Sequence, residues 1–560
     1  MFRPRFFVLA HENIALFKNI PHKTGVLFLI ILILSLPPMS SSGAGEEKMF
    51  EGKFPPASNR FDMTAKAHEG WRMKVAKTFV PANVTSPPHF QSMRLRIWDR
   101  LLHATTPFNK RELEDFKTIV YYEWLRWEKD GIFYNPESTR RLGYEYDWWQ
   151  GDIHSILDMM ELDPRKEYLD WAVVYCDMLV ARKIDREDNL IDQASGRPLT
   201  TWHKFHVLNA QGKHAPELHV LLARAAKLKT TDPDRYQRLV EDYKKHLFVT
   251  ATPMMSGYMA YTLLRTAELI FRHPETHHVV CPDFHLPVRK KTGRTYLEKA
   301  ITFFHKGLEA LEFFSTNPAY WDDRKGMYVS PRNPYLQKIP PEDKDKFNAA
   351  AHSPKPWNRA FAILRAQAQA MNMLKKLDPD RYAAIIKRYQ SQIDRNVRHW
   401  VEDLRHNQTM RGHAVWWAYG KKGRWAEDIL HALATSNLLA NLYRLGCHTV
   451  TFEHLRSVAI NFLDQTYVPE EKSYGPFIVA TDATEGTGQK PLISTLPYTP
   501  YHPEFWPVIS SAIGHFGLPG KLHTGYWLKL YKAKHAWLEL MARERKRRAK
   551  LPPNPPPAFT

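Results

Sequence analysis

Apolar residues recur at helical spacing along most of this chain. Amphipathic segments begin near Phe90, Lys110, Thr295 and Thr451. Other segments begin at Asp-Pro pairs, a usual arrangement at the first turn of a helix: Asp163-Pro164, Asp232-Pro233 and Asp378-Pro379. No sustained alternation of apolar and polar residues indicates a large sheet. The sequence therefore predicts an all-α fold of many helices with short connections.

A weak internal repeat follows several of these helices. Each copy is a polar turn, usually with Gly or Asn, and then a short apolar or aromatic extended piece. The copies lie at residues 128–136, 185–192, 322–331 and 470–477. Repeated helical hairpins joined in this way must close on one another to bury their apolar faces.

The N-terminal segment has the composition of an export signal. Basic residues precede the apolar run 26–36, which is too short to cross a bilayer comfortably, and Ser42-Gly43-Ala44 offers small residues for cleavage. We expect residues 1–45 to be a signal peptide or an N-terminal anchor, which is the chain's one expected link to a membrane. The remainder is then secreted or periplasmic.

The rest of the chain divides by composition into three parts. We expect an extended N-terminal segment at 46–88, one helical domain at 89–541 and a basic, Pro-rich disordered tail at 542–560. With 560 residues, of which 44% are hydrophobic, the chain can bury a large core.

Charge and cysteine content narrow the classes of partner. The formal net charge is +20, and about half of that excess lies between the two ends, which favours an anionic partner. No nucleic-acid motif, phosphate-binding loop or nucleophile motif appears. Three scattered cysteines are too few for a disulfide framework or a zinc site. We expect no nucleic acid, no metal and no cofactor.

The segment 412–446 has the most distinctive pattern. The aromatics Trp416, Trp417 and Tyr419 precede a Gly- and Lys-rich turn and then a predicted helix. We expect Glu427 and Asp428 in its first turn, with His431 on the same side. Leucines on every side of the following turns predict a helix buried all round, so its charged end should open on a cavity. The alternative is that the helix dipole alone favours these acids and the histidine pairs locally.

These features resemble the (α/α) toroid proteins that act on polysaccharides. The resemblance rests on long helical hairpins, aromatic-rich loops, an export signal, Trp417-Ala418-Tyr419 and the segment 427–432, EDILHA. It covers about residues 90–520 and includes six-hairpin glycosidase-like hydrolases and polyuronate lyases without selecting one family. It implies an incomplete or six-hairpin toroid with a central cavity lined by aromatic and polar groups.

A second aromatic and acidic segment lies at 144–154. Trp and Tyr rings stack on sugar faces, and carboxylates bond to sugar hydroxyls. The candidate groups here are Tyr144, Asp147, Trp148, Trp149 and Asp152. We expect a loop, with Asp152 at the N-cap of the helix that follows. The alternative is that the rings pack the loop and the acids cap it.

Two further segments offer substrate-binding groups. Trp357, Asn358 and Arg359 open a predicted helix, where Asn358 can cap the helix and Arg359 can pair with a carboxylate, either of the protein or of a uronate. His203 and His206 are candidate bases or substrate ligands, because their spacing matches no strong metal signature.

We therefore expect an exported enzyme that degrades an anionic polysaccharide, with glycoside hydrolysis as the favoured reaction and two alternatives. In a glycoside hydrolase, Glu427 or Asp428 would face Asp147 or Asp152 as a carboxylate pair. In a polysaccharide lyase, a His or Tyr base would act with Asn358 and Arg359 on a uronate. The second alternative is a non-catalytic glycan-binding or scaffold protein on the same fold.

Overall fold

The computed structural model describes residues 44–63, 71–74, 78–81, 88–129, 146–182, 191–192, 194–207, 231–238, 247–281, 293–331, 352–421, 426–478, 489–519 and 524–550. The chain separates into two units, Met1–Lys48 and Met49–Thr560. The fold and the site described below belong to the second unit.

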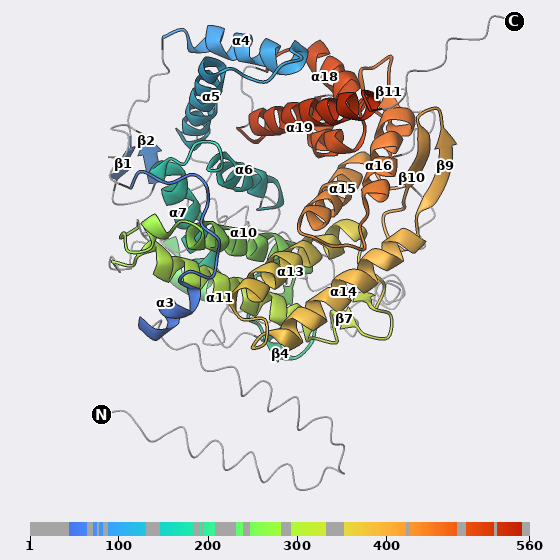
Figure 1. The fold of residues 1–560 in the computed structure, drawn as a ribbon. Coiled ribbons are helices and arrows are strands. Elements are labelled where there is room, and N and C mark those ends of the chain that lie inside the picture. Colours follow the sequence, from blue (N-terminus) through green and yellow to red (C-terminus); the bar gives the residue numbers. More distant parts are fainter. Residues whose placement is uncertain are drawn as a thin grey trace, which may run out of the picture. The chain divides into compact units, whose positions relative to one another are not determined.

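Helices make up most of the described structure, so the prediction of a mostly helical chain is confirmed (Figure 1). The α-helices are α3 (Ala44–Phe50), α4 (Phe90–His103), α5 (Lys110–Lys129), α6 (Tyr146–Met159), α7 (Lys166–Arg182), α10 (Pro253–Phe271), α11 (Tyr296–Ser315), α13 (Trp357–Leu377), α14 (Ala383–Glu402), α15 (Ile429–Arg444), α16 (Phe452–Asn461), α17 (Gln489–Thr495), α18 (Phe505–His515) and α19 (Thr524–Arg548). Short helical turns are η3 (Pro274–Thr276), η5 (Phe462–Thr466) and η6 (Leu496–Tyr501).

The strands form two-stranded antiparallel ladders throughout the described ranges. The pairs are β1 (Trp71–Lys74) with β2 (Thr78–Pro81), β3 (Ile191–Asp192) with β4 (Arg197–Pro198), β5 (His203–Val207) with β6 (Leu247–Ala251), β7 (Trp321–Asp322) with β8 (Met327–Tyr328), β9 (Arg405–Thr409) with β10 (Gly412–Trp416), and β11 (Tyr467–Val468) with β12 (Ser473–Tyr474). The predicted repeat segment 322–331 contains β8 and the last residue of β7, and the segment 470–477 contains β12. Of the segment 185–192, only the two residues of β3 are described. The fourth, 128–136, lies almost wholly outside the described residues.

Local sequence signals fix several helix starts. Thr295 and Thr451 each form a capping box, in which the threonine hydroxyl accepts a backbone N–H from the third helical residue. Pro253 occupies the first position of α10, where a missing N–H costs nothing. The sequence also predicts helices that begin near Pro216, Arg424 and Lys521, and these starts lie outside the described residues.

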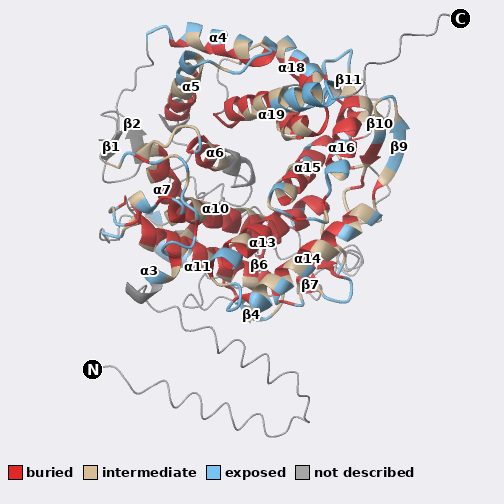
Figure 2. Ribbon diagram, viewed as in Figure 1, coloured by how far each residue is buried: buried red, intermediate tan, exposed pale blue. Residues whose placement is uncertain are grey.

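Burial separates two kinds of helix (Figure 2). α10 and α13 are buried on nearly all sides. α14 instead buries one stripe at helical spacing, formed by Tyr389, Gln392, Ile393, Asn396, Val397 and Trp400. An all-round apolar surface requires neighbours on every side, whereas a single stripe requires one. By their contacts rather than by burial, we call α6, α10, α13 and α15, which contact one another in that order, the inner helices, and α7, α11, α14 and α16, which each follow one of them, the outer helices.

The inner helices run in the same direction. On α6 and α10, His154 lies beside Thr262, and Asp158 pairs with Arg265 further along both helices. On α10 and α13, Gly257 lies against Ile363, and Glu268 accepts a hydrogen bond from Gln369.

α15 continues this parallel arrangement beside α13. Trp357 N–H bonds to the carbonyl of Tyr419, which precedes α15, at 3.4 Å. At the far ends Asn372 donates to the carbonyl of Leu445 at 2.9 Å. The starts of the inner helices therefore lie at one side of the packed layer.

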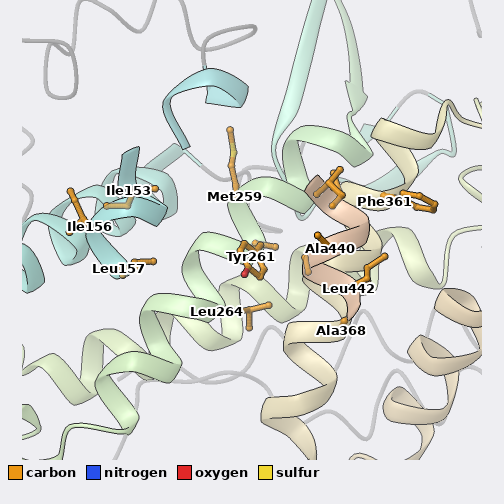
Figure 3. Close-up of a cluster of buried hydrophobic side chains, with 14 of the residues drawn as sticks. Ile153, Ile156, Leu157, Met259, Tyr261, Leu264, Phe361, Ala368, Ala440 and Leu442 are labelled. Atoms are coloured by element: carbon orange, nitrogen blue, oxygen red, sulfur yellow. The ribbon is translucent and has the colours of Figure 1, made fainter. Parts of the chain in front are cut away.

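Packing contacts connect the two ends of the second unit. α4 contacts α5, α18 and α19, and α19 also contacts α5 and α6. In Figure 1, α4 and α5 accordingly lie beside the red C-terminal helices α18 and α19. The hydrophobic core is one cluster, and part of it draws on α6, α10, α13 and α15 (Figure 3).

The two expected terminal segments contain regular structure. Residues 46–88, expected to be extended, include most of α3 and the β1–β2 pair. α19 runs to Arg548, so the expected disordered tail is helical at its start, and residues 551–560 lie outside the described ranges. Among the described residues, no helix has the length and apolar character needed to cross a membrane.

The backbones of α10 and α13 are in close contact at Gly257. A Cβ added to Gly257 would lie 2.5 Å from the backbone nitrogen of Ile363 and 2.6 Å from the carbonyl carbon of Ala362. Real Cβ atoms do not approach backbone so closely, so only glycine permits this helix separation.

We predict that Gly257→Ala lowers the free energy of unfolding by about 1–3 kcal/mol, because α10 and α13 must move apart. Gly514→Ala in α18 is the matched control, since its Cβ would meet Leu102 at 3.5 Å, an ordinary contact. Urea denaturation of both variants checks this. Equal midpoints for the two alanine variants would contradict the assigned role of Gly257.

Candidate functional site

Most predicted site residues lie in segments that lead into an inner helix. Trp357, Asn358 and Arg359 are the first residues of α13. The segment from β10 to the first turn of α15 contains Trp416, Trp417, Tyr419, Glu427, Asp428 and His431. Because the inner helices are parallel, these segments lie on the same side of the layer.

The structure brings four of these side chains together, and we call Arg359, Tyr419, Asp428 and His431 the Tyr419 cluster. The rings of Tyr419 and His431 meet edge to face, with centroids 4.8 Å apart. Arg359, which is exposed, donates a hydrogen bond to the Tyr419 hydroxyl. The cluster therefore joins the start of α13 to the start of α15.

Asp428 holds His431 in place. Its side chain caps α15 by accepting the backbone N–H groups of Leu430 at 3.1 Å and His431 at 3.2 Å. The same carboxylate bonds to Nδ1 of His431. A proton on Nδ1 leaves the lone pair on Nε2, the form of imidazole that can accept a proton from a substrate. The side chains of His431 and Asp428 are 45% and 42% exposed, so solvent reaches both.

Two groups in or beside the Tyr419 cluster have shifted pKa values. Burial raises the pKa of Tyr419, and Glu427 and Asp428 add to this while Arg359 opposes it. The phenol is therefore protonated at neutral pH. Burial, with repulsion from Arg359, lowers the pKa of the Lys355 amine to about 8. Lys355 was not anticipated from the sequence, although it stands one helical turn before Arg359.

Glu427 has a different environment from the one expected. It precedes α15, whose first residue is Ile429, and its side chain is fully buried. The carboxyl group accepts hydrogen bonds from the indole of Trp417 and the hydroxyl of Thr435. Burial raises its pKa well above the usual range. Backbone bonds from Glu427 to Trp417 and from Ile478 to Glu427 tie the segment into the core, because strand-like pairing continues past β10.

The aromatic platforms are less available than expected. Trp357 and Trp417 are fully buried, and their rings pack near Phe361 and Trp400 respectively. Trp416 is half-buried, and the guanidinium of Arg405 lies 4.5 Å from its ring centroid. Of the aromatic rings expected to stack on a sugar in this segment, the half-buried ring of Tyr419 is the one that belongs to the Tyr419 cluster.

Two local expectations about helices were wrong. Asn358 does not cap α13, since the N-cap residue is Pro356, and the Asn358 side chain is buried. α15 is not buried all round. A less buried stripe runs along it at helical spacing, formed by Leu430, Ala434, Asn437, Asn441 and Arg444. The polar members of this stripe were hidden in the sequence by the more numerous leucines.

The segment at 144–154 is largely helical rather than a loop. α6 begins at Tyr146, so Asp147, Trp148, Trp149 and Asp152 are helical, and Asp152 is not an N-cap. Their side chains, and all of Tyr144, lie outside the described part of the structure. The position of α6 still places the start of this helix on the same side as the Tyr419 cluster.

His203 and His206 belong to strand β5, which pairs with β6 immediately before α10. Their side chains lie outside the described part of the structure. Among described side chains, no group of three or more His, Cys, Asp or Glu residues is arranged to hold a metal ion. Cys176, Cys281 and Cys447 are buried and form no disulfide.

Comparison with known proteins identifies no relative: no family model, curated protein or solved structure matches this chain.

The Tyr419 cluster combines three chemical capacities in one place. Arg359 can bind a carboxylate, His431 can accept a proton through Nε2, and Tyr419 can donate one. By contrast, buried Glu427 stabilises the segment that positions them.

We predict that Glu427→Gln makes the protein's stability less sensitive to rising pH. Glu427 has a raised pKa in the folded state, so the folded protein keeps a proton that the unfolded chain loses. The wild type therefore loses stability as the pH rises above about 4.5, towards the folded-state pKa. Glutamine resembles the protonated acid and does not titrate.

Urea midpoints of both proteins between pH 5 and pH 8 check this, and the variant should gain relative to the wild type as the pH rises. A constant difference across that range would show that Glu427 is ionised in the folded protein.

Proposed function

We propose that this protein is an exported enzyme on an (α/α) toroid that cleaves an anionic polysaccharide by β-elimination at a uronate. The observation that carries the proposal is the Tyr419 cluster, which holds an arginine, a tyrosine and an Asp-oriented histidine together.

The toroid assignment is supported by parallel inner helices, outer helices and contacts between the first and last helices. The proposed hairpins are α6–α7, α10–α11, α13–α14, α15–α16, α17 and η6 with α18, and α19 with α4 and α5. In such a fold, the segments that lead into the inner helices gather at one mouth of the ring. The export assignment rests on the composition of residues 1–45.

The proposed reaction assigns one role to each group. Arg359 binds the uronate carboxylate and stabilises the negative charge that develops when the neighbouring C–H bond breaks. His431 Nε2 takes that proton. The electron pair forms a C=C bond while the glycosidic C–O bond breaks, and Tyr419 protonates the departing oxygen. The raised pKa of Tyr419 suits a proton donor.

Hydrolysis is the second candidate, and one observation favours it. Glu427 has a raised pKa, as a general acid needs, and its neighbour Asp428 is partly exposed. The carboxyl of Glu427 is buried, however, so a substrate would reach it only after the segment moved. This ranks elimination ahead of hydrolysis.

We predict that Tyr419→Phe and His431→Gln each lower the rate of uronate-polysaccharide cleavage by about 10²–10⁴-fold with little change in stability. Tyr382→Phe, at the start of α14 and the opposite end of the α13–α14 hairpin, is the matched control and should keep full activity.

The assay follows both ultraviolet absorbance of unsaturated products and new reducing ends on uronate and neutral polysaccharides. Reducing ends without unsaturated product would favour hydrolysis. Full activity in both variants would reject the Tyr419 cluster as the reacting site, and binding without any cleavage would favour a glycan-binding protein.

Lys355 gives the proposed site a predictable pH dependence. Its pKa of about 8 means that its positive charge, next to Arg359, is present below pH 8 and is lost above it. We predict that KM for a uronate substrate rises as the pH passes through about 8, and that Lys355→Met has a higher KM that no longer changes there. Steady-state kinetics from pH 6.5 to 9 check this, and an unchanged pH profile in the variant would exclude Lys355.

A further inference from the structure

Arg365, in the middle of α13, is a buried cation with no anionic partner among the residues that the structure describes. The residue is 5% exposed, and its Nε and Nη2 atoms are buried without a hydrogen-bond partner. The strongest charged influences on it among the described residues are two cations, Arg265 and Arg444, and no carboxylate is among them. A buried guanidinium is normally paired, so its isolation requires an explanation.

Aromatic rings stabilise the cation only in part. The guanidinium carbon lies 3.9 Å from the ring centroid of Tyr261 and 4.9 Å from that of Tyr258, both on α10. Such contacts attract a cation but do not use its N–H groups. Figure 3 shows Tyr261 within the cluster formed by the inner helices. The rings therefore hold the guanidinium group while leaving Nε–H and Nη2–H unused.

The neighbouring acid is already neutralised. Asp158 on α6 pairs with Arg265 and also with Lys532 of α19, the latter at 3.0 Å. Arg265 and Lys532 together more than balance this carboxylate, and the pKa of Asp158 is held below its usual range by them. Asp158 is therefore not available as the counter-ion of Arg365.

His154 on α6 adds a second unused group. Its Nε2 lies 3.3 Å from the hydroxyl of Thr262, while Nδ1 is buried and has no partner. Arg365 and Arg265 both act on this imidazole through their charge. The surroundings of Arg365 thus contain two further cationic side chains, Arg265 and Arg444, an imidazole with an unbonded nitrogen, and one carboxylate that is paired with other cations.

We propose that the Nε–Nη2 edge of Arg365, within electrostatic reach of Arg444 and His154, binds an oxyanion group, either a carboxylate or a sulfate or phosphate. Nε–H and Nη2–H are the two parallel donors that accept an oxyanion in a bidentate arrangement. Arg444 supplies further positive charge from α15.

The position of Arg365 connects this site to the Tyr419 cluster. Arg365 is seven residues after Asn358, so both lie on one side of α13, separated by about 10 Å along the helix. The Asn358 side-chain oxygen is also buried without a partner. Identifying the oxyanion as a second charged group of the glycan rests on the proposed function, whereas the oxyanion site itself does not.

The first experiment measures melting temperature with added sulfate at constant ionic strength. Sulfate should raise the melting temperature of the wild type saturably, by about 2 °C or more. Arg365→Met should be at least as stable as the wild type without sulfate, because it removes an unpaired buried charge, and should lose the sulfate effect. Arg381→Met is the matched control, since Arg381 also lies over a tyrosine ring, and it should keep that effect.

If Arg365 only stabilised the fold and bound no oxyanion, the opposite pattern would be expected. Destabilisation of Arg365→Met in sulfate-free buffer, or an unchanged response to sulfate, would overturn the proposal. If Arg365→Met does not fold, Arg444→Gln provides the test, because exposed Arg444 contributes charge rather than core packing. It should weaken sulfate binding measurably in calorimetry, and unchanged affinity would count against the site.

The second experiment separates the two sources of the oxyanion. Calorimetry with a uronic-acid tetrasaccharide, in the presence and absence of sulfate, uses Tyr419→Phe so that turnover is slow. Competition by sulfate, with at least about tenfold weaker tetrasaccharide binding in Arg365→Met, supports a glycan group. Sulfate binding without competition assigns the site to a free ion and overturns the substrate assignment, whatever the outcome of the cleavage assay.

Discussion

Backbone contact between α10 and α13 at Gly257 sets the geometry on which the site depends. Because no side chain separates the helices there, their axes approach closely near their starts, and a parallel direction follows from the contacts further along. Parallel helices gather their N-terminal ends, and each such end carries a partial positive charge. The segments that enter α13 and α15 therefore meet in a region that favours anions even before Arg359 and Lys355 contribute their charges.

Burial of charged groups has three different outcomes in this protein. Asp158 remains ionised because Arg265 and Lys532 compensate for its desolvation. Glu427 has no cationic partner among the described residues, and burial favours its protonated form. Arg365 cannot readily lose its proton, so it stays charged and unpaired between tyrosine rings. Asp158 and Glu427 therefore need no further partner from outside the chain. Arg365 does need one, and in our proposal a bound anion supplies it.

The helices could be predicted from the sequence because their signals are local. Apolar spacing, the capping threonines Thr295 and Thr451, and Pro253 at a first turn each involve residues a few positions apart. The cluster of Arg359, Tyr419 and His431 was only partly predictable. The composition of the segment with Arg359 and of the segment with Tyr419 and His431 was unusual in each case. That these side chains lie together, however, depends on the packing of α13 beside α15.

Local sequence patterns did not predict which of the candidate residues are buried. Glu427 and Trp417 looked accessible because both adjoin a polar turn, yet pairing with residues near Ile478 places them in the core. Arg365 gave no signal at all, since an arginine in an apolar helix usually finds a carboxylate on a neighbouring helix. Its significance comes from the absence of such a partner among the groups that surround it on α6, α10 and α15. Charge placed at two depths on α13, at Arg359 and at Arg365, favours a ligand that carries more than one anionic group over one that carries a single charge.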